Sequence, residues 1–343
     1  MSLVVSVLLA ALLGFSAHRA GICTVKAVAE LLSTRRPYLI ISFAKTSAWV
    51  VAISSLAAGL SFDARFLLWP LTWYGVIGGL VFGVGAGING GCIFSTLARV
   101  CDGNLNMLAA VLMWPAGAIL EIGFMQPYVF EAGYKLIPGF QQSSTLYPTL
   151  RIGLAAWVVW ELIRLLVTRS SSTGLRSAPG TNRFRLSSAA ALIGISNAII
   201  FYNYQNWSFT TAVLISFAPS GDATRTNIVA IWALVLAAIG GMLFSSFQRR
   251  SFMLSVRDGR AIIRHAAGGA MMGVGAAMIP GGNDSLILFG MPTLSPHAFP
   301  SYVAIICGIT LVFFVMRLRG KELPQVVCTA DVCITGATAD AKM

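Results

Sequence analysis

The stretch from residue 83 to residue 104 reads GVGAGINGGCIFSTLARVCDGN and places Cys92 directly behind two glycines and ahead of an apolar segment. In a soluble protein a glycine-rich run of this kind could form a phosphate-binding loop, so the solvent around it has to be established first. The composition is 57% hydrophobic and only 10% charged, which lies far outside the balance of soluble domains. The sequence therefore predicts a membrane protein.

Apolar windows recur along the chain on both sides of this stretch. Each is about 17 to 22 residues long, enough for a helix to cross roughly 30 Å of hydrocarbon. Nine such windows are predicted, at residues 2–17, 38–60, 73–89, 106–127, 149–167, 187–203, 226–245, 262–280 and 298–316. The first window has neither a basic leader nor a small-residue cleavage site, so we expect a permanent span rather than a signal peptide.

The net charge of +12 is carried by a few loops between the windows. The basic residues that follow odd-numbered windows include Arg35, Arg36, Arg164, Arg185, Arg249, Arg250, Arg317 and Lys321. The positive-inside rule makes these loops cytoplasmic, which places the amino terminus outside and the carboxyl terminus inside a bacterial inner membrane. Charge confined to such loops argues against nucleic acid as a partner.

A second glycine run repeats the first. Residues 268–284 read GGAMMGVGAAMIPGGND, and they align with GGLVFGVGAGINGGCI at 78–93 when one residue is inserted before the double glycine. The alignment sets Gly85 on Gly275 and Cys92 on Asn283. A single window, and thus an odd number of spans, separates the two copies. They therefore enter the membrane from opposite sides, as in the inverted repeats of many secondary transporters.

The chain divides accordingly. We expect a first membrane repeat at 1–148, a linking span with a basic cytoplasmic linker at 149–186, a second, inverted repeat at 187–320, and a disordered cytoplasmic tail at 321–343. The tail carries Cys328 and Cys333. One pair of cysteines cannot complete a zinc site, and a stable disulfide is not expected in the cytosol.

Each copy is interrupted twice where a continuous helix would be expected. The interruptions are HRAGIC at 18–23, INGGC at 88–92, NYQNWS at 203–208 and IPGGND at 279–284. About ten apolar residues follow each one, too few to span a membrane alone. The predicted fold is therefore an all-α polytopic membrane protein, an inverted-repeat bundle of about nine transmembrane helices with four short re-entrant or half helices meeting near the midplane. Non-helical backbone is tolerated at that depth only where protein or a water-filled cavity satisfies it, so we expect the breaks to line the substrate path.

The side chains and glycines at these breaks define the candidate path. It comprises Cys23, Asn89, Gly90, Gly91, Cys92, Gly281, Gly282, Asn283 and Asp284. Cys23 and Cys92 stand at the starts of short helices, where free N–H groups and the positive end of the helix dipole favour an anion. Packing as a small hydrophobic residue is the alternative role for each cysteine. Asp284 is either a carboxyl group that takes part in proton-coupled transport or a helix cap. These residues indicate a small anion as substrate, preferably a polarisable sulfur oxyanion.

Three motifs resemble the YeeE/YedE family of sulfur-compound transporters over about residues 10–317. They are GINGGCIFSTLARVCDGN, RAGICTVKA and PGGNDSLILFGMPTLSPHAFPSY. The resemblance implies a nine-helix inverted repeat with short re-entrant helices, and thiosulfate as substrate. It also implies that Cys23, where the ion enters, and Cys92, at the constriction, pass the ion along by hydrogen bonds from S–H to sulfur. The family's thiosulfate carriers have a third functional cysteine in the second repeat, where PGGND supplies Asn283 and Asp284 instead; Cys307 is the only cysteine nearby.

We therefore expect uptake of a small sulfur-containing anion, thiosulfate foremost, with no enzymatic activity, cofactor or metal. One alternative is a channel or carrier for another small anion or a different sulfur or selenium species. Another is a membrane scaffold that hands sulfur to a cytosolic carrier protein. The expected partners are the sulfur oxyanion and the lipid bilayer, with a cytosolic sulfur carrier as a further one.

Overall fold

The structure, a computed structural model, describes residues 2–58, 68–124, 146–171, 183–204, 206–217, 228–256, 258–329 and 331–335. The long helices in these ranges are α1 (Leu3–Ala20), α3 (Tyr38–Ala58), α4 (Trp73–Asn89), α6 (Asn106–Phe124), α8 (Leu146–Ser171), α9 (Leu186–Tyr204), α12 (Ile228–Arg249), α13 (Gly259–Met278) and α15 (Ala298–Leu318). The short ones are α2 (Thr24–Thr34), α5 (Ile93–Cys101), α10 (Phe209–Phe217) and α14 (Asn283–Ser285), which continues as the π-helical turn η1 (Leu286–Gly290). Strands β1 (Val326–Thr329) and β2 (Val332–Thr335) form one hairpin.

The apolar helices are those of a multi-pass membrane protein. In the described ranges six helical segments are long and apolar enough to cross a membrane, and seven if α13 and the α14–η1 segment, which bend by 48° at their break, count as one span. A shorter apolar stretch lies in α3 over Tyr38–Ser54. The all-α membrane class is thus confirmed, whereas the nine crossings remain a prediction.

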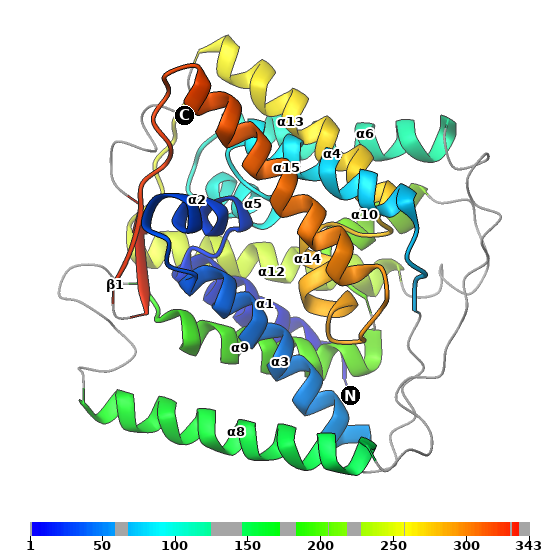
Figure 1. Ribbon diagram of the computed structural model, residues 1–343, viewed down its shortest axis with the longest axis vertical. Helices are drawn as coiled ribbons and strands as arrows, with labels where there is room; N and C mark the ends of the chain where they lie inside the picture. Colours follow the sequence, from blue (N-terminus) through cyan, green and yellow to red (C-terminus); the bar gives the residue numbers. More distant parts are fainter. Residues whose placement is uncertain are drawn as a thin grey trace.

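The long helices pack in two groups of four, and each group mixes the two sequence copies. One group joins α4 and α6 to α13 and α15, and the other joins α1 and α3 to α9 and α12 (Figure 1). The short helices α2, α5 and α14 lie between the two groups (Figure 1). Helix α8 packs against α3 at the edge of the molecule, where Lys45 and Arg164 both pair with the buried carboxylate of Glu161. The interior between the groups is therefore built by short helices from both halves of the sequence.

Glycine spacing allows the long helices to approach closely. A Cβ atom added at Gly83 would stand 2.2 Å from the carbonyl oxygen of Ile305 on α15. One added at Gly273 would stand 2.0 Å from the carbonyl oxygen of Trp114 on α6. Real Cβ atoms essentially never come within 3.0 Å of another heavy atom, so only glycine fits at these positions. Small residues on facing helix surfaces thus let the backbones of neighbouring helices approach closely.

The helix interruptions fall where the sequence predicts them. Helix α1 ends at Gly21 and α4 at Gly90, both in the left-handed region with φ of 64° and 74°. In this conformation the cap N–H groups bond back to the last turn, which closes each helix without a further partner. The other two breaks separate α9 from α10 and α13 from α14. Each break thus delivers the start of a short helix to the middle of the molecule (Figure 1).

A buried polar cluster fixes the first break against the rest of the bundle. The His18 ring at the end of α1 bonds through Nδ1 to Ser245 Oγ on α12 at 2.9 Å, and through Nε2 to Asp102 Oδ1, after α5, at 3.2 Å. Ser246 and Ser251 donate hydrogen bonds to the same carboxylate oxygen at 2.8 and 2.6 Å. The ends of α1 and α5 are therefore tied together through α12.

The prediction of a disordered tail is wrong for residues 326–335. They form the β1–β2 hairpin, in which Cys328 stands opposite Cys333 and is joined to it by a disulfide. The hairpin packs on α2, so the expectation of an unpaired, unpacked cysteine pair is corrected as well. Antiparallel pairing of the strands brings the two sulfurs into cross-strand register, and burial against α2 supplies the apolar contact that a lone hairpin lacks. Residues 336–343 and the predicted linker at 172–182 lie outside the described residues.

Candidate functional site

A small cavity lies where the short helices converge between the two helix groups. Its volume is about 30 Å³, which is room for roughly two water molecules. It is lined by Ala17, Ile22, Cys23, Phe43, Thr46, Cys92, Phe94, Ile193, Asn283, Asp284, Ile287 and Leu288. Four residues of the predicted path, including the aligned pair Cys92 and Asn283, therefore meet at one cavity although they are up to 261 positions apart.

Two thiols occupy the starts of two short helices. Cys23 immediately precedes α2 and Cys92 immediately precedes α5, and both side chains are buried. The Cys23 thiol donates a hydrogen bond to Ser95 Oγ at 3.1 Å and faces the thiol of Cys92. The backbone N–H of Cys92 points at the Cys23 sulfur, and those of Thr24 and Ser95 point at the Cys92 sulfur. The free N–H groups of two helix starts thus converge on the thiol pair, an arrangement that attracts negative charge.

Asn283 places a side-chain amide beside the thiols. Its Nδ2 donates a hydrogen bond to Thr24 Oγ1 at 3.2 Å, which ties the start of α14 to the start of α2. Its Oδ1 is buried without a hydrogen-bond partner among the described residues. The phenolic oxygen of Tyr302, on α15, is likewise buried and unsatisfied within the described part of the chain. Polar atoms left unsatisfied in an apolar interior are suited to a bound water or ligand.

Asp284 acts as a helix cap, although not of its own helix. Thr210 Oγ1 donates to Asp284 Oδ1 at 2.6 Å, and the backbone N–H of Thr210 donates to Oδ2 at 3.3 Å. Thr210 lies in the first turn of α10, so the carboxylate satisfies a free N–H of that helix. The capping alternative predicted from the sequence is a cap of the helix that Asp284 itself begins, whereas the carboxylate caps α10 instead. The role of Asp284 in transport remains a prediction.

The remaining predicted residues lie behind the cavity wall and shape the breaks. Asn89 Nδ2 donates to the carbonyl oxygen of Gly91 and to Thr96 Oγ1, at 2.9 and 2.8 Å, and Asn89 Oδ1 bonds to the His265 ring at 2.8 Å. Gly90, Gly91, Gly281 and Gly282 form the turns at the two aligned breaks. A Cβ at Gly282 would stand 2.7 Å from Thr210 Oγ1, so this glycine lets α14 approach α10. None of these five residues is among those that line the cavity described here.

Sequence reasoning missed several residues around the thiols. The sequence does contain a signal for Thr24 and Ser95, because they follow Cys23 by one residue and Cys92 by three. In the first turn of a helix, a Ser or Thr hydroxyl can form hydrogen bonds with nearby backbone groups. Phe43 and Thr46, contributed by α3, carry no comparable signal, since they belong to an apolar helix that only the tertiary packing brings to the cavity. Cys307 is exposed on α15 and does not line the cavity.

A bundle of apolar helices with a cavity at the starts of interrupted helices is typical of membrane transporters. The chain belongs to the sulphur transport family, whose sequence profile matches residues 19–311. It is also similar to the thiosulfate transporter TsuA of Escherichia coli K12, with 25% identity over 351 residues, which cover 93% of this chain and 96% of that protein. The resemblance to the YeeE/YedE transporters and the expected transport of a sulfur-containing anion are confirmed by these matches.

Proposed function

We propose that the protein takes up thiosulfate through the central cavity, with the thiols of Cys23 and Cys92 as the groups that pass the ion. The observation that carries the proposal is the convergence of two thiols and several backbone N–H groups on one cavity. Thiosulfate offers a soft terminal sulfur to the S–H groups and hard oxygens to the N–H groups and to the Asn283 amide. The name of the Escherichia coli relative supports the same substrate.

The cavity is a constriction, because it holds only about two water molecules, which have fewer non-hydrogen atoms than a thiosulfate ion. Passage therefore requires the starts of the short helices to separate. The hydrogen bonds that hold them together around the thiols include Cys23 to Ser95 and Asn283 to Thr24. An anion can replace each of these hydrogen bonds with one of its own, so the ion itself lowers the cost of opening.

The proposed architecture is an inverted repeat of nine transmembrane helices with re-entrant short helices. Its best support is the crossing of α4 and α13. A Cβ at Gly275 would lie 2.6 Å from the oxygen of Gly78, and one at Gly85 would lie 2.7 Å from the oxygen of Gly268. The alignment pairs Gly78 with Gly268 and Gly85 with Gly275, so exchanging the two copies turns one contact into the other. That reciprocity is typical of a two-fold axis.

Exchanging the two sequence copies also relates the packing of the other long helices. Helix α4 packs on α15 as α13 packs on α6, and α1 packs on α12 as α9 packs on α3. Close glycine contacts occur in both members of the second pair of packings, at Gly14 against Ala238 and at Gly194 against Trp49. Gly14 and Gly194 are also aligned in the sequence. The boundaries of the two repeats, 1–148 and 187–320, remain part of this proposal.

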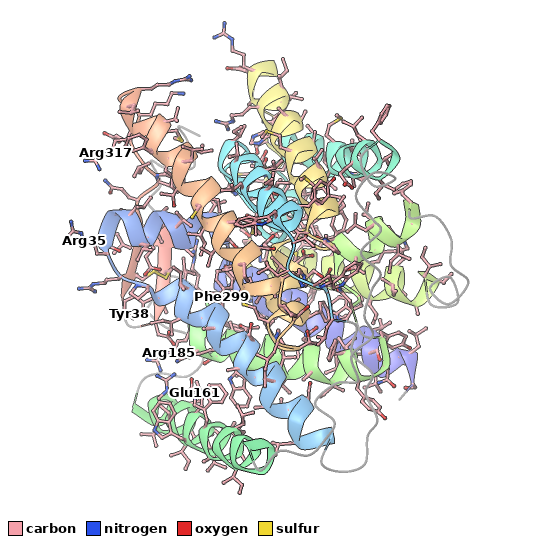
Figure 2. The ribbon with its side chains drawn as sticks, turned by 45° about the vertical axis from the view of Figure 1, so that its right-hand side comes forward. Arg35, Tyr38, Glu161, Arg185, Phe299 and Arg317 are labelled. Carbon is pink, nitrogen blue, oxygen red and sulfur yellow. A yellow bond between two sulfur atoms is a disulfide. The ribbon has the colours of Figure 1, made fainter. Side chains whose placement is uncertain are left out.

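The proposed orientation places the carboxyl terminus in the cytoplasm of a bacterial cell, with the protein in the inner membrane. Figure 2 shows Arg35, Arg185 and Arg317 along the same side of the molecule. These residues come from three loops that the positive-inside rule assigns to the cytoplasm. A cytosolic sulfur carrier as partner remains a prediction from the sequence.

Uptake of ³⁵S-thiosulfate into vesicles from cells without other sulfur uptake systems tests the proposed path. We expect Cys92→Ala to reduce the initial rate by about 10- to 100-fold, because one hydrogen bond to a charged group contributes about 1.5–3 kcal/mol. Cys101→Ala is the matched control, since Cys101 is also buried but lies outside the cavity, and it should retain wild-type uptake.

Equal uptake by the wild type and Cys92→Ala would overturn the thiol path. Equal transport of thiosulfate and sulfate by the wild type would instead indicate a general channel for small anions, because sulfate lacks the soft sulfur. A labelled persulfide on the protein, detected by mass spectrometry after exposure to thiosulfate, would indicate the sulfur-scaffold alternative.

A further inference from the structure

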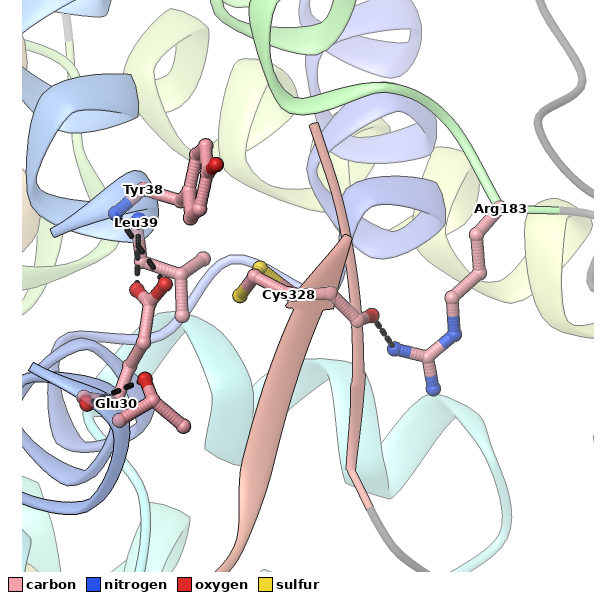
Figure 3. The surroundings of a disulfide bond; sticks show 7 residues. Glu30, Tyr38, Leu39, Arg183 and Cys328 are labelled. Atoms are coloured by element: carbon pink, nitrogen blue, oxygen red, sulfur yellow. Dashed lines mark hydrogen bonds between the residues drawn. A yellow bond between two sulfur atoms is a disulfide. The ribbon is translucent and has the colours of Figure 1, made fainter. Parts of the chain in front are cut away.

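The hairpin of the tail buries two sulfur atoms beside a buried carboxylate. Cys328 and Cys333 are 3% and 6% exposed, and Glu30 on α2 is fully buried. The two sulfurs and a carboxylate oxygen of Glu30 all lie within 4.8 Å of one another. Figure 3 shows the Glu30 side chain and the disulfide of Cys328 near each other. Residues about 300 positions apart therefore place three ligand atoms in one small volume.

The hairpin is anchored independently of the disulfide. Its turn residue Asp331 accepts the backbone N–H of Leu186 at its carbonyl oxygen, at 2.7 Å, and that of Ser187 at Oδ2, at 3.0 Å. Arg183 donates to the carbonyl oxygen of Cys333 at 2.8 Å. These contacts attach the hairpin to the start of α9 while its sulfurs face α2. The cysteines would consequently stay near Glu30 after the S–S bond is broken.

Glu30 is placed to act as a ligand. Its carboxylate accepts the backbone N–H groups of Tyr38 and Leu39, at 3.2 and 2.9 Å, which fix its orientation toward the hairpin. A carboxylate has about four acceptor positions, so these two bonds leave capacity on both oxygens. Within the described chain no salt bridge to Glu30 is formed, and a buried carboxylate beside two thiolates requires a positive charge.

We propose that Glu30, Cys328 and Cys333 form a redox-gated binding site for a thiophilic divalent cation of the zinc class. In the disulfide form the site is closed. A dithiol reductant supplies two electrons and two protons, which break the S–S bond and give two thiols while the dithiol becomes a disulfide. The cation then displaces the two thiol protons and binds two thiolates and one carboxylate, with water in the fourth position of a tetrahedral site.

The location of the site gives it a route to the transport path. Glu30 follows Cys23 by seven residues on α2, which corresponds to about 10 Å along the helix. Cation binding would fix the position of the second half of α2, the helix that has Cys23 at its start. The cytoplasmic position proposed for the tail favours the reduced, binding form, because cytosolic thiols are kept reduced.

Cadmium titration of the full-length protein in detergent tests the site without measuring transport. The protein is reduced with dithiothreitol, freed of reductant without air, and titrated with Cd²⁺ while the thiolate-to-cadmium charge-transfer absorption is recorded. We expect the Cys328→Ser/Cys333→Ser double variant to bind one equivalent fewer than the reduced wild type. Wild type oxidised with diamide should lose the same equivalent. Glu30→Gln should weaken that binding at least about 10-fold, because loss of a direct ligand costs no less than loss of a partner that only orients a ligand.

Cys307→Ser is the matched control, because Cys307 is a free, exposed cysteine on α15 that does not belong to the proposed site, and it should bind as the wild type does. Size-exclusion elution and melting temperature identify a variant that fails to fold. If Glu30→Gln fails to fold, the cadmium stoichiometries of the cysteine double variant and of the oxidised wild type, each compared with the reduced wild type, still test the site. Equal cadmium stoichiometry in the reduced wild type and the double variant would overturn the proposal, as would equally tight binding by the oxidised protein.

Discussion

At the scale of single residues, the cavity depends on polar groups that satisfy one another across helix starts. Asp284 caps α10, Asn283 bonds to Thr24, and Cys23 bonds to Ser95. Each bond joins two different interrupted helices. A substitution in this set is therefore expected to change both the stability of the bundle and the ease with which the constriction opens.

Asp284 allows these two effects to be separated. Asp284→Ala leaves the Thr210 N–H and hydroxyl without their acceptor, which should cost about 1–3 kcal/mol and lower the melting temperature in detergent. Asp284→Asn retains one acceptor oxygen and should lose less stability. If Asp284 carries a proton, Asp284→Asn will also abolish the pH dependence of thiosulfate uptake. Uptake by Asp284→Asn that matches the wild type at every pH would exclude the proton-carrying role.

His297 makes the stability of the outer end of α15 depend on pH. Burial lowers the pKa of this ring to about 4, although a hydrogen bond to the backbone of Trp69 opposes the shift. Below an unfolded-state pKa of about 6.5 the unfolded chain takes up a proton that the folded protein does not, so stability falls between pH 6.5 and pH 4. The loss at pH 5 amounts to about 2 kcal/mol.

Melting temperatures in detergent at pH 7.5 and pH 5 measure this effect. The fall in melting temperature should be smaller in His297→Gln, which cannot take up the proton but can still bond to Ser295. An identical fall in the variant and the wild type would show that other groups control the acid sensitivity.

At the scale of helices, the packing depends on which glycines face a neighbour. On α12, a Cβ at Gly241 would lie 1.9 Å from the carbonyl oxygen of Ala11 on α1. At the adjacent Gly240 nothing lies within 4 Å of the added atom. Two neighbouring glycines in one helix therefore have opposite roles, and sequence alone does not distinguish them.

Alanine substitution at these two positions tests the packing. Gly241→Ala should separate α1 from α12 and destabilise the protein by about 1–3 kcal/mol or more, as overpacking does. Gly240→Ala should be neutral or stabilise the helix by up to about 1 kcal/mol, because alanine favours helices over glycine. Thermal unfolding in detergent compares the two. Similar melting temperatures for both variants would contradict the close contact of α1 with α12.

At the scale of the whole molecule, the two sequence copies are interleaved rather than adjacent. Each group of four long helices takes two helices from each copy, and the short helices meet between the groups (Figure 1). Residues of both sequence copies line the apolar cavity, so neither copy would form the site alone. The arrangement also predicts that the two ends of the helix bundle lie on opposite faces of the membrane.

Labelling of introduced cysteines tests the membrane orientation. Leu71 precedes α4 on the face that we propose to be external, and Arg319 follows α15 on the face that we propose to be cytoplasmic; both are exposed. In intact cells a membrane-impermeant maleimide should label Leu71→Cys but not Arg319→Cys, and after permeabilisation it should label both. The reverse pattern would invert the proposed topology, and labelling of both in intact cells would contradict it.

The sequence by itself determined the membrane class and the positions of the four helix breaks, because hydrophobic length and backbone freedom are local properties of the chain. It also singled out Cys23, Cys92, Asn283 and Asp284 through the internal repeat. Only the tertiary structure decided that Asp284 caps α10, that Phe43 and Thr46 complete the cavity, and that the tail folds as a hairpin on α2. These features depend on contacts between segments far apart in the chain, and the free energy of such contacts comes from burial against partners that no local pattern identifies.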